Sequence, residues 1–496
     1  MQERFGPLNW PPIFTLYNGK TQALKTRFLL FLLALSTTFV LAQPKIPRGQ
    51  LIQDLEILKR NLEAYHTGLY TYCSKETLDA WFETTQSQLP DSLTAYEFFR
   101  VVGPLNSLIA NGHTYLHINP ATREPHLNIP SFGIYKYQDS YLIKSTQQDE
   151  YQHLIGHKLV TLNGEPIGEV FQSLMKYRTR DGNNTTMPAE ELQHYFALTY
   201  SLVYGSTETI QVTYQDDQGR SQTINIPSIP AEGNVAPSAA ELLYDEGGVH
   251  FEIKDSVGIL TVQTFNQAAL EKVGYLAQLQ SIFSEIAAAE IQHLIVDVRN
   301  NGGGNTPMVE ALLSYLCDQP FVFYKGVYQA HRQWDTSIIP AVAEYPKISL
   351  GWAYLKKDPN GLYRITITDG IKKVHPQPNV FRGHLYVFGN GNSLSAAGEF
   401  GSFIKHHREA TFIGEELGGN QVQNTSGQDL IMLLPHSQLA VKIPFVLWKM
   451  NVDTENDGHG VQPDYWVRNT IQQELSDEDA VMKFALKHIA DLREGR

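Results

Sequence analysis

The chain has little of what metal sites and disulfide frameworks need. Its 496 residues include only two cysteines, Cys73 and Cys317. In an exported protein the two could form one bridge, but they do not make a disulfide scaffold. The sequence also lacks the HExxH and CxxC spacings that hold zinc. We therefore expect neither a metal nor a cofactor.

The chain also has fewer basic than acidic residues. The chain has 39 Lys and Arg against 52 Asp and Glu, which gives a formal net charge of -13 at pH 7. No block of Lys and Arg could follow a phosphate backbone, so we expect no nucleic-acid partner. With 42% hydrophobic and 18% charged residues, the chain can bury real cores, and its length suggests two or three domains.

The N-terminal apolar run is short for a transmembrane helix, which needs about 20 residues. The run covers residues 28–35, follows the basic residues Lys25 and Arg27, and leads to the small residue Ala42. This order is typical of a secretory signal peptide, and an N-terminal membrane anchor is the alternative. We interpret residues 1–42 as an upstream extension plus signal peptide. The protein is then expected to be exported, periplasmic or extracellular, with no stable membrane span after signal removal.

Changes of pattern along the chain predict separate domains. Residues 51–108 repeat apolar side chains every three to four positions, which predicts an N-terminal helical domain over 46–120. Residues 125–230 form short alternating segments, with Asn163-Gly164 as a hairpin turn, and predict a β-rich module with one helix near 169–177. A linker over 231–242 follows. Strand and helix patterns then alternate, which predicts an α/β core over 245–475 and a C-terminal helix over 476–496.

A glycine-rich turn follows a predicted buried strand. Residues 293–298 form an apolar run, and Gly302, Gly303 and Gly304 come soon after it. Three glycines free the backbone to turn sharply and to present N–H groups, which could bind an oxyanion or a phosphate. The segment is not a P-loop, because no Gly-Lys-Ser/Thr follows. A tight turn without any ligand is the alternative interpretation.

A second turn of small residues places a serine at the start of a helix. Residues 385–388 predict a strand, residues 396–404 predict a helix, and Ser395 lies between them. The N–H groups and the dipole at a helix N-terminus favour negative charge, which suits a nucleophile whose attack creates an oxyanion. A serine N-cap without a catalytic role is the alternative. The GxSxG elbow of the α/β-hydrolases is absent.

Five segments together resemble the C-terminal-processing (tail-specific) proteases, a family of serine peptidases. Residues 297–304 resemble the DLRxNGGG segment of that family, 395–400 its SAxE segment, 413–419 its xGExTxG turn, 460–464 its closing GxxPD and 111–114 its DGHT. The resemblance implies a ClpP/crotonase-like α/β core, Ser395 as nucleophile and polypeptides as substrates. One departure is that the acid of SAxE falls on Gly398, with Glu399 next.

The family divides by the group that activates the serine. One branch uses a Ser–Lys dyad, and its lysine would fall at Asn420 here, while Lys405 lies in the predicted helix. The other branch resembles the tricorn core protease and uses Ser, His and a carboxylate. Likeness to that branch makes His113 the candidate base. The third group is Asp457, which fits the spacing, or Glu455, which fits the residue type.

The resemblance also implies how the intermediate is stabilised. The oxyanion would be held by the backbone N–H groups of Gly304 and Ala396. A histidine with a pKa near neutral can take the serine proton and return it to the leaving amine. A carboxylate would fix the histidine tautomer and stabilise its protonated form. These roles define an acyl-enzyme mechanism on Ser395.

The β-rich module resembles the degenerate PDZ-like domain of such proteases. Residues 156–167 match its GxxixxinGxpi segment, whereas residues 130–133 are only a weak match to a carboxylate-binding loop. PDZ domains add a peptide as an extra strand. Two alternatives to an active endopeptidase stay open: a peptide-binding protein of the same fold that has lost catalysis, and a serine esterase or lipophilic-ligand carrier.

Overall fold

The computed structural model describes residues 44–119, 127–232, 248–333, 335–340, 343–344 and 354–495. The expected signal peptide and most of the expected linker over 231–242 lie outside the described residues. Residues 45–496 form one compact unit. No helix among the described residues is long and apolar enough to cross a membrane.

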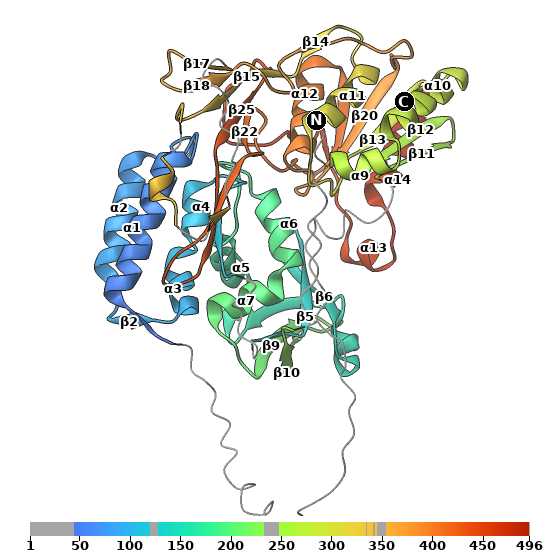
Figure 1. Cartoon of the computed structure of the whole chain (residues 1–496). Coiled ribbons are helices and arrows are strands. Elements are labelled where there is room, and N and C mark those ends of the chain that lie inside the picture. Colours follow the sequence, from blue (N-terminus) through green and yellow to red (C-terminus); the bar gives the residue numbers. More distant parts are fainter. Residues whose placement is uncertain are drawn as a thin grey trace, which may run out of the picture. The chain divides into compact units, whose positions relative to one another are not determined.

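The apolar repeat of the N-terminal part forms helices, as predicted. They are α1 (Arg48–Tyr65), α2 (Lys75–Gln88), α3 (Ala95–Val102) and α4 (Leu105–Ile109). The repeat leucines of α1 are almost fully buried, since Leu51, Leu55, Leu58 and Leu62 are at most 2% exposed. Thr94 and Glu97 form a capping box that fixes the start of α3. Figure 1 shows these helices in blue.

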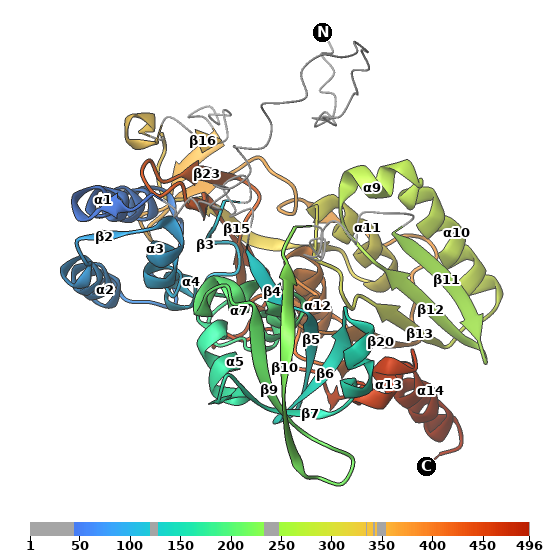
Figure 2. The ribbon, with the colours of Figure 1, turned by 90° about the horizontal axis from the view of Figure 1, so that it is seen from below.

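The β-rich module is built on one antiparallel sheet. Its strands are β4 (Asn128–Pro130), β5 (Phe132–Tyr137), β6 (Ser140–Thr146), β7 (Lys158–Leu162), β8 (Glu165–Pro166), β9 (Thr209–Gln215) and β10 (Ser221–Pro230). The sheet order is β4-β10-β9-β7-β6-β5, with β8 paired to β7. Figure 2 shows β4, β10, β9, β7, β6 and β5 together in this sheet. Asn163 and Gly164 turn between β7 and β8 with φ of 49° and 83°, as the hairpin signal predicted.

The module contains more helix than the sequence predicted. Besides α5 (Ile167–Met175), it has α6 (Thr186–His194) and α7 (Phe196–Tyr204). The prediction of one helix was wrong, because Leu192, Phe196 and Tyr200 recur at helical spacing and are buried in the module's core. The helix α6 packs beside β5, the last strand of the sheet order.

The α/β core forms around a six-stranded sheet of order β11-β12-β13-β20-β21-β26. These strands are β11 (Val249–Lys254), β12 (Val257–Val262), β13 (His293–Asp297), β20 (His384–Gly389), β21 (Ala410–Gly414) and β26 (Tyr465–Trp466). All neighbours from β12 to β26 pair in parallel, and β11 forms an antiparallel hairpin with β12. The predicted α/β layers are confirmed.

Helices cover both faces of this sheet. The helices α9 (Gln267–Lys272), α10 (Tyr275–Ala288), α11 (Thr306–Leu316) and α12 (Ala396–His407) bury the face that carries Leu260, Leu294 and Val387. The C-terminal helix α14 (Ala480–Arg493), preceded by α13 (Ile471–Leu475), buries the face that carries Ile295 and Phe388. Burial on both faces explains why these parallel strands are continuous apolar runs.

Two further sheets join distant parts of the chain. One has the order β17 (Leu355–Lys357), β18 (Tyr363–Ile365), β15 (Tyr324–Gln329), β25 (Val446–Met450) and β22 (Gln423–Thr425). The other has the order β16 (Ala343–Glu344), β23 (Asp429–Leu433), β24 (Ala440–Pro444) and β3 (Tyr115–His117). Because β3 directly follows residues 111–114, its pairing with β24 brings the segment of His113 to the core.

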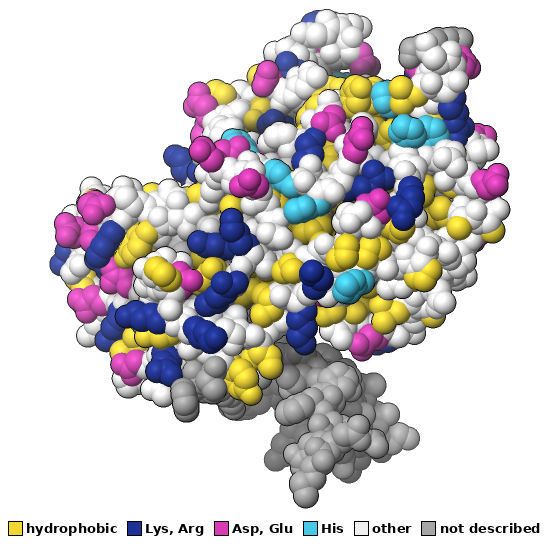
Figure 3. All heavy atoms as spheres, turned by 90° about the horizontal axis from the view of Figure 1, so that it is seen from above, with side chains coloured by type: hydrophobic (Ala, Val, Ile, Leu, Met, Phe, Trp, Pro, Cys, Tyr) yellow, Lys and Arg dark blue, Asp and Glu magenta, His cyan; other side chains and the backbone are white. Residues whose placement is uncertain are grey.

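The surface shows no single-sign stripe on the face that Figure 3 presents. Lys and Arg side chains lie there among acidic, histidine and hydrophobic ones. Cys73 and Cys317 are both buried and free. Burial raises the pKa of each thiol, to about 12 for Cys317, so neither is a reactive thiolate.

Candidate active site

Ser395 lies where strand β20 passes into helix α12. It is the N-cap residue of α12, with a φ of 55° and a ψ of -124°. A positive φ is strained for a residue with a Cβ, and such strain collects at functional sites. Its side chain makes no capping hydrogen bond. The N-cap interpretation therefore does not account for this serine.

The glycine turn after β13 lies directly against Ser395. Gly303 and Gly304 have φ of 99° and 149°, where a side chain is strained. A Cβ placed on Gly303 would lie 2.7 Å from the Cβ of Ser395 and 2.9 Å from the nitrogen of Ala396. The N–H groups of Gly304 and Ala396 donate to no other residue in the described part of the chain. Two free amide donors thus flank the serine.

The hydroxyl of Ser395 contacts a buried polar chain. The side-chain Nδ2 of Asn424, on β22, lies 3.4 Å from Ser395 Oγ and donates over 3.0 Å to Glu399 Oε1. Tyr324 donates its hydroxyl to Glu399 Oε2 over 2.7 Å. Burial raises the pKa of the Glu399 carboxyl, and burial and Glu399 raise the pKa of Tyr324. The four side chains link Ser395 to the interior.

The departure at Gly398 has a steric cause. A Cβ on Gly398 would lie 2.5 Å from the carbonyl oxygen of Gly418, which is too close for any side chain. The helix α12 therefore meets the turn after β21 at a position that only glycine fits. The acid of this helix is Glu399, four residues after Ser395 and buried against Asn424 and Tyr324.

His113 lines a cavity that reaches the turn before Ser395. The cavity has a volume of about 930 Å³, and His113, Gly303, Leu394 and Lys442 are among its lining residues. Burial, and then the charge of Lys442, lower the pKa of His113 to about 3, so the imidazole is neutral at neutral pH. Its Nδ1 is buried without a hydrogen-bond partner. No hydrogen bond joins it to Ser395 in the described structure.

The two candidate carboxylates lie on the turn after β25. Both Asp457 and Glu455 are exposed. Asp457 Oδ1 accepts the backbone N–H of His459 over 2.9 Å. Neither carboxylate is hydrogen-bonded to His113 in the described residues. The third member of the expected triad thus stays a prediction, as do the roles of His113 and Ser395.

The structure gives the alternative lysine dyad no support. Asn420 is buried and donates to Asn456 Oδ1 over 2.8 Å. Lys405 is on α12, where its Nζ forms an ion pair of 2.6 Å with Asp464.

Sequence comparison identifies the family of the α/β core region. Residues 256–467 match the family model described as Peptidase family S41. This region is a peptidase family S41 domain. It contains the glycine turn, Ser395, Glu399 and the turn that bears Asp457 and Glu455. The prediction of a serine-type peptidase family is confirmed for this domain.

Solved structures give the fold of nearly the whole chain. The chain superimposes on mature CPAF with a TM-score of 0.62 at 15% identity, over 86% of this chain and 94% of that chain. It also superimposes on mature CPAF complexed with lactacystin, with a TM-score of 0.64 at 14% identity, over 90% of this chain and 99% of that chain. At this identity the likeness establishes the fold alone. The α/β protease fold with a helical N-terminal part is therefore confirmed.

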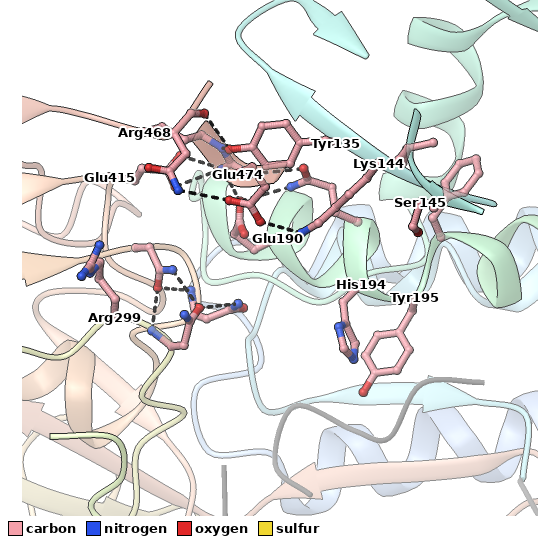
Figure 4. A pocket seen from close by; sticks show the side chains of 18 of the residues that line it. Tyr135, Lys144, Ser145, Glu190, His194, Tyr195, Arg299, Glu415, Arg468 and Glu474 are labelled. Atoms are coloured by element: carbon pink, nitrogen blue, oxygen red, sulfur yellow. Dashed lines mark hydrogen bonds and ion pairs between the residues drawn. The ribbon is translucent and has the colours of Figure 1, made fainter. Parts of the chain in front are cut away.

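A second cavity of about 780 Å³ lies between the β-rich module and the S41 domain. Figure 4 shows Arg468 beside Glu415, Glu190 and Glu474 on one wall, with His194 and Tyr195 apart from them. Arg468 forms ion pairs with Glu190 on α6 and with Glu415 after β21. The two cavities share His194, Tyr195, Asn300 and Asn392 among their lining residues, so they adjoin beside the nucleophile turn.

Sequence patterns missed several residues of the S41 site. Asn424 and Tyr324 come from one sheet that no motif predicted, and Asp181 comes from a loop of the β-rich module. Asp181 is 3% exposed, and its carboxylate accepts the N–H of Gly112, next to His113. Nothing in the one-dimensional pattern marks these three. Glu399 is different, because the sequence showed it directly after the acid position of SAxE, although it did not show which residues Glu399 contacts.

Proposed function

We propose that this protein is an exported serine endopeptidase that hydrolyses peptide bonds of polypeptide substrates through an acyl-enzyme on Ser395. The observation that carries the proposal is the strained serine at the N-terminus of α12, beside two free amide donors, within an S41 domain. A peptide carbonyl at this point would meet a nucleophile and an oxyanion site together.

The chemistry follows from the groups around Ser395. His113 takes the hydroxyl proton as Ser395 Oγ attacks the carbonyl carbon. The oxyanion that forms lies against the N–H groups of Gly304 and Ala396. His113 then returns the proton to the leaving amine, and the same imidazole activates the water that hydrolyses the ester. Removing one oxyanion donor typically costs about 2.7–4 kcal/mol of barrier.

The protonation state of His113 supports its role as acceptor. Its pKa of about 3 keeps the imidazole neutral, which is the form that can accept a proton. A base with so low a pKa is weak, so a carboxylate placed beside the free Nδ1 would strengthen it. We assign that role to Asp457 ahead of Glu455, because Asp457 fits the spacing of the tricorn-like branch.

Paired variants test the assignment of the carboxylate. We expect Asp457→Asn to slow acylation by up to about 10⁴-fold, as loss of a triad carboxylate does. Glu455→Gln, a matched exposed carboxylate two residues away, should leave the rate unchanged. The rate constant of labelling by a fluorophosphonate probe reports both. If Glu455→Gln is slow and Asp457→Asn is not, the role belongs to Glu455. If both variants label at the wild-type rate, neither carboxylate assists His113.

The β-rich module would serve as a PDZ-like polypeptide site. Strand β5 ends the sheet order, and the second cavity is lined by Phe132, Gly133 and Ile134 of β5 and by Gln193 of α6. Gln193 Oε1 accepts the backbone N–H of Lys136, which shows that this edge of β5 faces α6. A polypeptide could add to β5 as a further strand. Labelled peptides with free or amidated C-termini, bound to the full-length Ser395→Ala protein, test this; no binding of either would reject it.

Export is testable by itself. A signal peptide that ends at Ala42 predicts a mature protein that begins at Gln43. N-terminal sequencing of protein recovered outside the cytoplasm should give that residue. A chain that starts at Met1 and stays in the cytoplasm would contradict export without touching the peptidase proposal.

Probe labelling decides between an active peptidase and a binding protein. Purified wild type should react with a fluorophosphonate, whereas folded Ser395→Ala and His113→Ala should not. A gel-based assay of cleavage of an unfolded polypeptide should follow the same order. If folded wild type neither labels nor cleaves, the protein is instead the catalytically inactive peptide-binding form.

A further inference from the structure

A four-residue loop of the β-rich module contacts the segments that carry His113 and Asp457 and a turn that lies beside Ser395. The loop is residues 181–184, Asp-Gly-Asn-Asn, between α5 and α6. The segments that it contacts are those of His113, of Asp457 and of the turn beside Ser395. The inference below rests on the function proposed above.

The first contact is with the segment of His113. Asp181 Oδ1 accepts the N–H of Gly112 over 2.9 Å, and the N–H of Gly182 donates to the carbonyl of Ala110 over 2.9 Å. A Cβ on Gly112 would lie 2.8 Å from Asp181 Oδ2, so the glycine is needed for this approach. These two hydrogen bonds fix the position of the backbone just before His113.

The second contact is with the turn of Asp457. The N–H of Asn183 donates to the carbonyl of Gly458 over 2.7 Å, and Asn183 Nδ2 donates to the carbonyl of Asp457 over 2.8 Å. A Cβ on Gly182 would lie 2.6 Å from the Cα of Gly458. The two backbones are packed in direct contact.

The third contact is with the turn beside the nucleophile. Asn184 Nδ2 donates to the carbonyl of Leu417 over 2.8 Å. A Cβ on Gly419 would lie 3.7 Å from Asp181 Oδ2 and 3.9 Å from the nitrogen of Ser395. The carboxylate of Asp181 and the backbone of Ser395 thus both lie near the Cβ position of one glycine.

We propose that residues 181–184 are a positioning clamp that holds the segments of His113, Asp457 and Ser395 in register, with the carboxylate of Asp181 as its central group. The clamp belongs to the β-rich module, while Ser395 and Asp457 belong to the S41 domain. The module therefore takes part in building the catalytic site, and Asp181 acts through Gly112 rather than on the substrate.

Ionisation of the Asp181 carboxyl destabilises the folded state, because the group is buried. Burial raises its pKa to about 6, although the N–H of Gly112 opposes this. Tyr72 is a titratable neighbour of this carboxyl: burial, and then the charges of Asp181 and Asp457, raise the pKa of Tyr72. A raised pKa means that the folded state favours the protonated carboxyl. Stability from this group is present below the unfolded pKa and is lost as pH rises toward 6. An uncharged asparagine at this position would avoid that loss.

Asp181→Asn is the central test, because it keeps an oxygen for the Gly112 N–H and removes the charge. We expect its labelling rate with the fluorophosphonate probe to fall about tenfold at pH 8, and the inflection near pH 6 in the wild-type profile to disappear. Its Tm at pH 8 should be equal to or above that of wild type. Asp181→Ala also loses the bond to Gly112, and its rate should fall by about 100-fold.

Asp216→Asn is the matched control. Asp216 also accepts backbone N–H groups, from Gln218 and Arg220, in a hairpin of the same module. Its replacement should leave the rate and the pH profile of labelling unchanged. Asn184→Ala is a second clamp variant that carries no charge change, and its rate should fall without a change of inflection.

Two results would overturn the clamp. One is a folded Asp181→Asn protein with the wild-type rate and profile. The other is a loss of labelling in Asp181→Ala and Asn184→Ala that only matches their loss of folded protein by circular dichroism. Failure of the proposed function is distinct, since wild type itself would then not label, or Ser395→Ala would label equally.

Discussion

The two halves of the proposed catalytic site are held in different ways. The nucleophile half consists of the glycine turn, which follows β13, and of Ser395 and Glu399, which follow the neighbouring parallel strand β20. The half that carries His113 and Asp457 comes from the helical part and from a late turn, and residues 181–184 connect it. In the described structure His113 Nδ1 has no partner and Asp457 is exposed.

This difference shows which half is preorganised. The amide donors and the strained serine are fixed by the backbone of a buried sheet, so they need no rearrangement to meet an oxyanion. The proton-transfer half depends on hydrogen bonds between loops, which is the kind of contact that tightens when a substrate binds. Substitutions in the first half should therefore affect folding together with activity. Those in the second half should affect activity alone.

The largest effect should come from Gly304→Ala. Its φ of 149° and a Cβ only 2.0 Å from the carbonyl carbon of Phe265 would force the turn to move. We expect a loss of about 2–5 kcal/mol of stability and no labelling. Gly219→Ala is the control, since Gly219 also has a positive φ but has open space around its Cβ position, and it should lose about 1–2 kcal/mol. Urea unfolding with equal losses for both would show that the turn is not preorganised.

The nucleophile half was predictable for the same reason that it is rigid. A buried strand followed by glycines, and a strand followed by small residues and a helix, are local patterns that place N–H groups and a serine at one edge of a parallel sheet. Asp181, Asn424 and Tyr324 were not predictable. Their function depends on which loops meet in space, and contacts between positions as far apart as Gly112 and Asp181 leave no local pattern. The helices α6 and α7 were missed within a β-rich stretch, although their apolar spacing was present.

The next effect should come from His113→Gln, which probes the second half. We expect a fall of about 10²- to 10⁴-fold in the labelling rate at pH 8 with a folded protein. The difference in stability between the variant and wild type should depend on pH. The pKa of His113 is lowered to about 3, so the stability that it contributes is present above the unfolded value of 6.5 and is lost as pH falls toward 3. The variant should therefore lose less Tm than wild type between pH 7 and pH 4. Equal losses of Tm would mean that His113 is not buried as a neutral group.

A smaller effect is expected from Asn424→Ala, at the junction of the nucleophile with its buried chain. The change removes the contact to Ser395 Oγ and one partner of Glu399. We expect about a tenfold lower labelling rate and a loss of about 1–3 kcal/mol of stability, because a buried carboxyl loses a donor. Asn424→Asp should be worse at pH 8 than at pH 5, since a second carboxylate beside Glu399 is repelled when both ionise. A wild-type rate for both variants would show that the contact of 3.4 Å does not orient the serine.

The smallest effect should come from Lys405→Met, which tests whether any lysine assists Ser395. Lys405 is the lysine of the helix that starts at the nucleophile, but its Nζ pairs with Asp464 at a partly exposed site. Such pairs contribute about 0–1 kcal/mol, so we expect little change in Tm and none in labelling rate or pH profile. A large loss of labelling at unchanged stability would mean that the helix moves to bring Lys405 to the serine. The preorganised half would then carry its own base, and His113 would lose the role that the resemblance gives it.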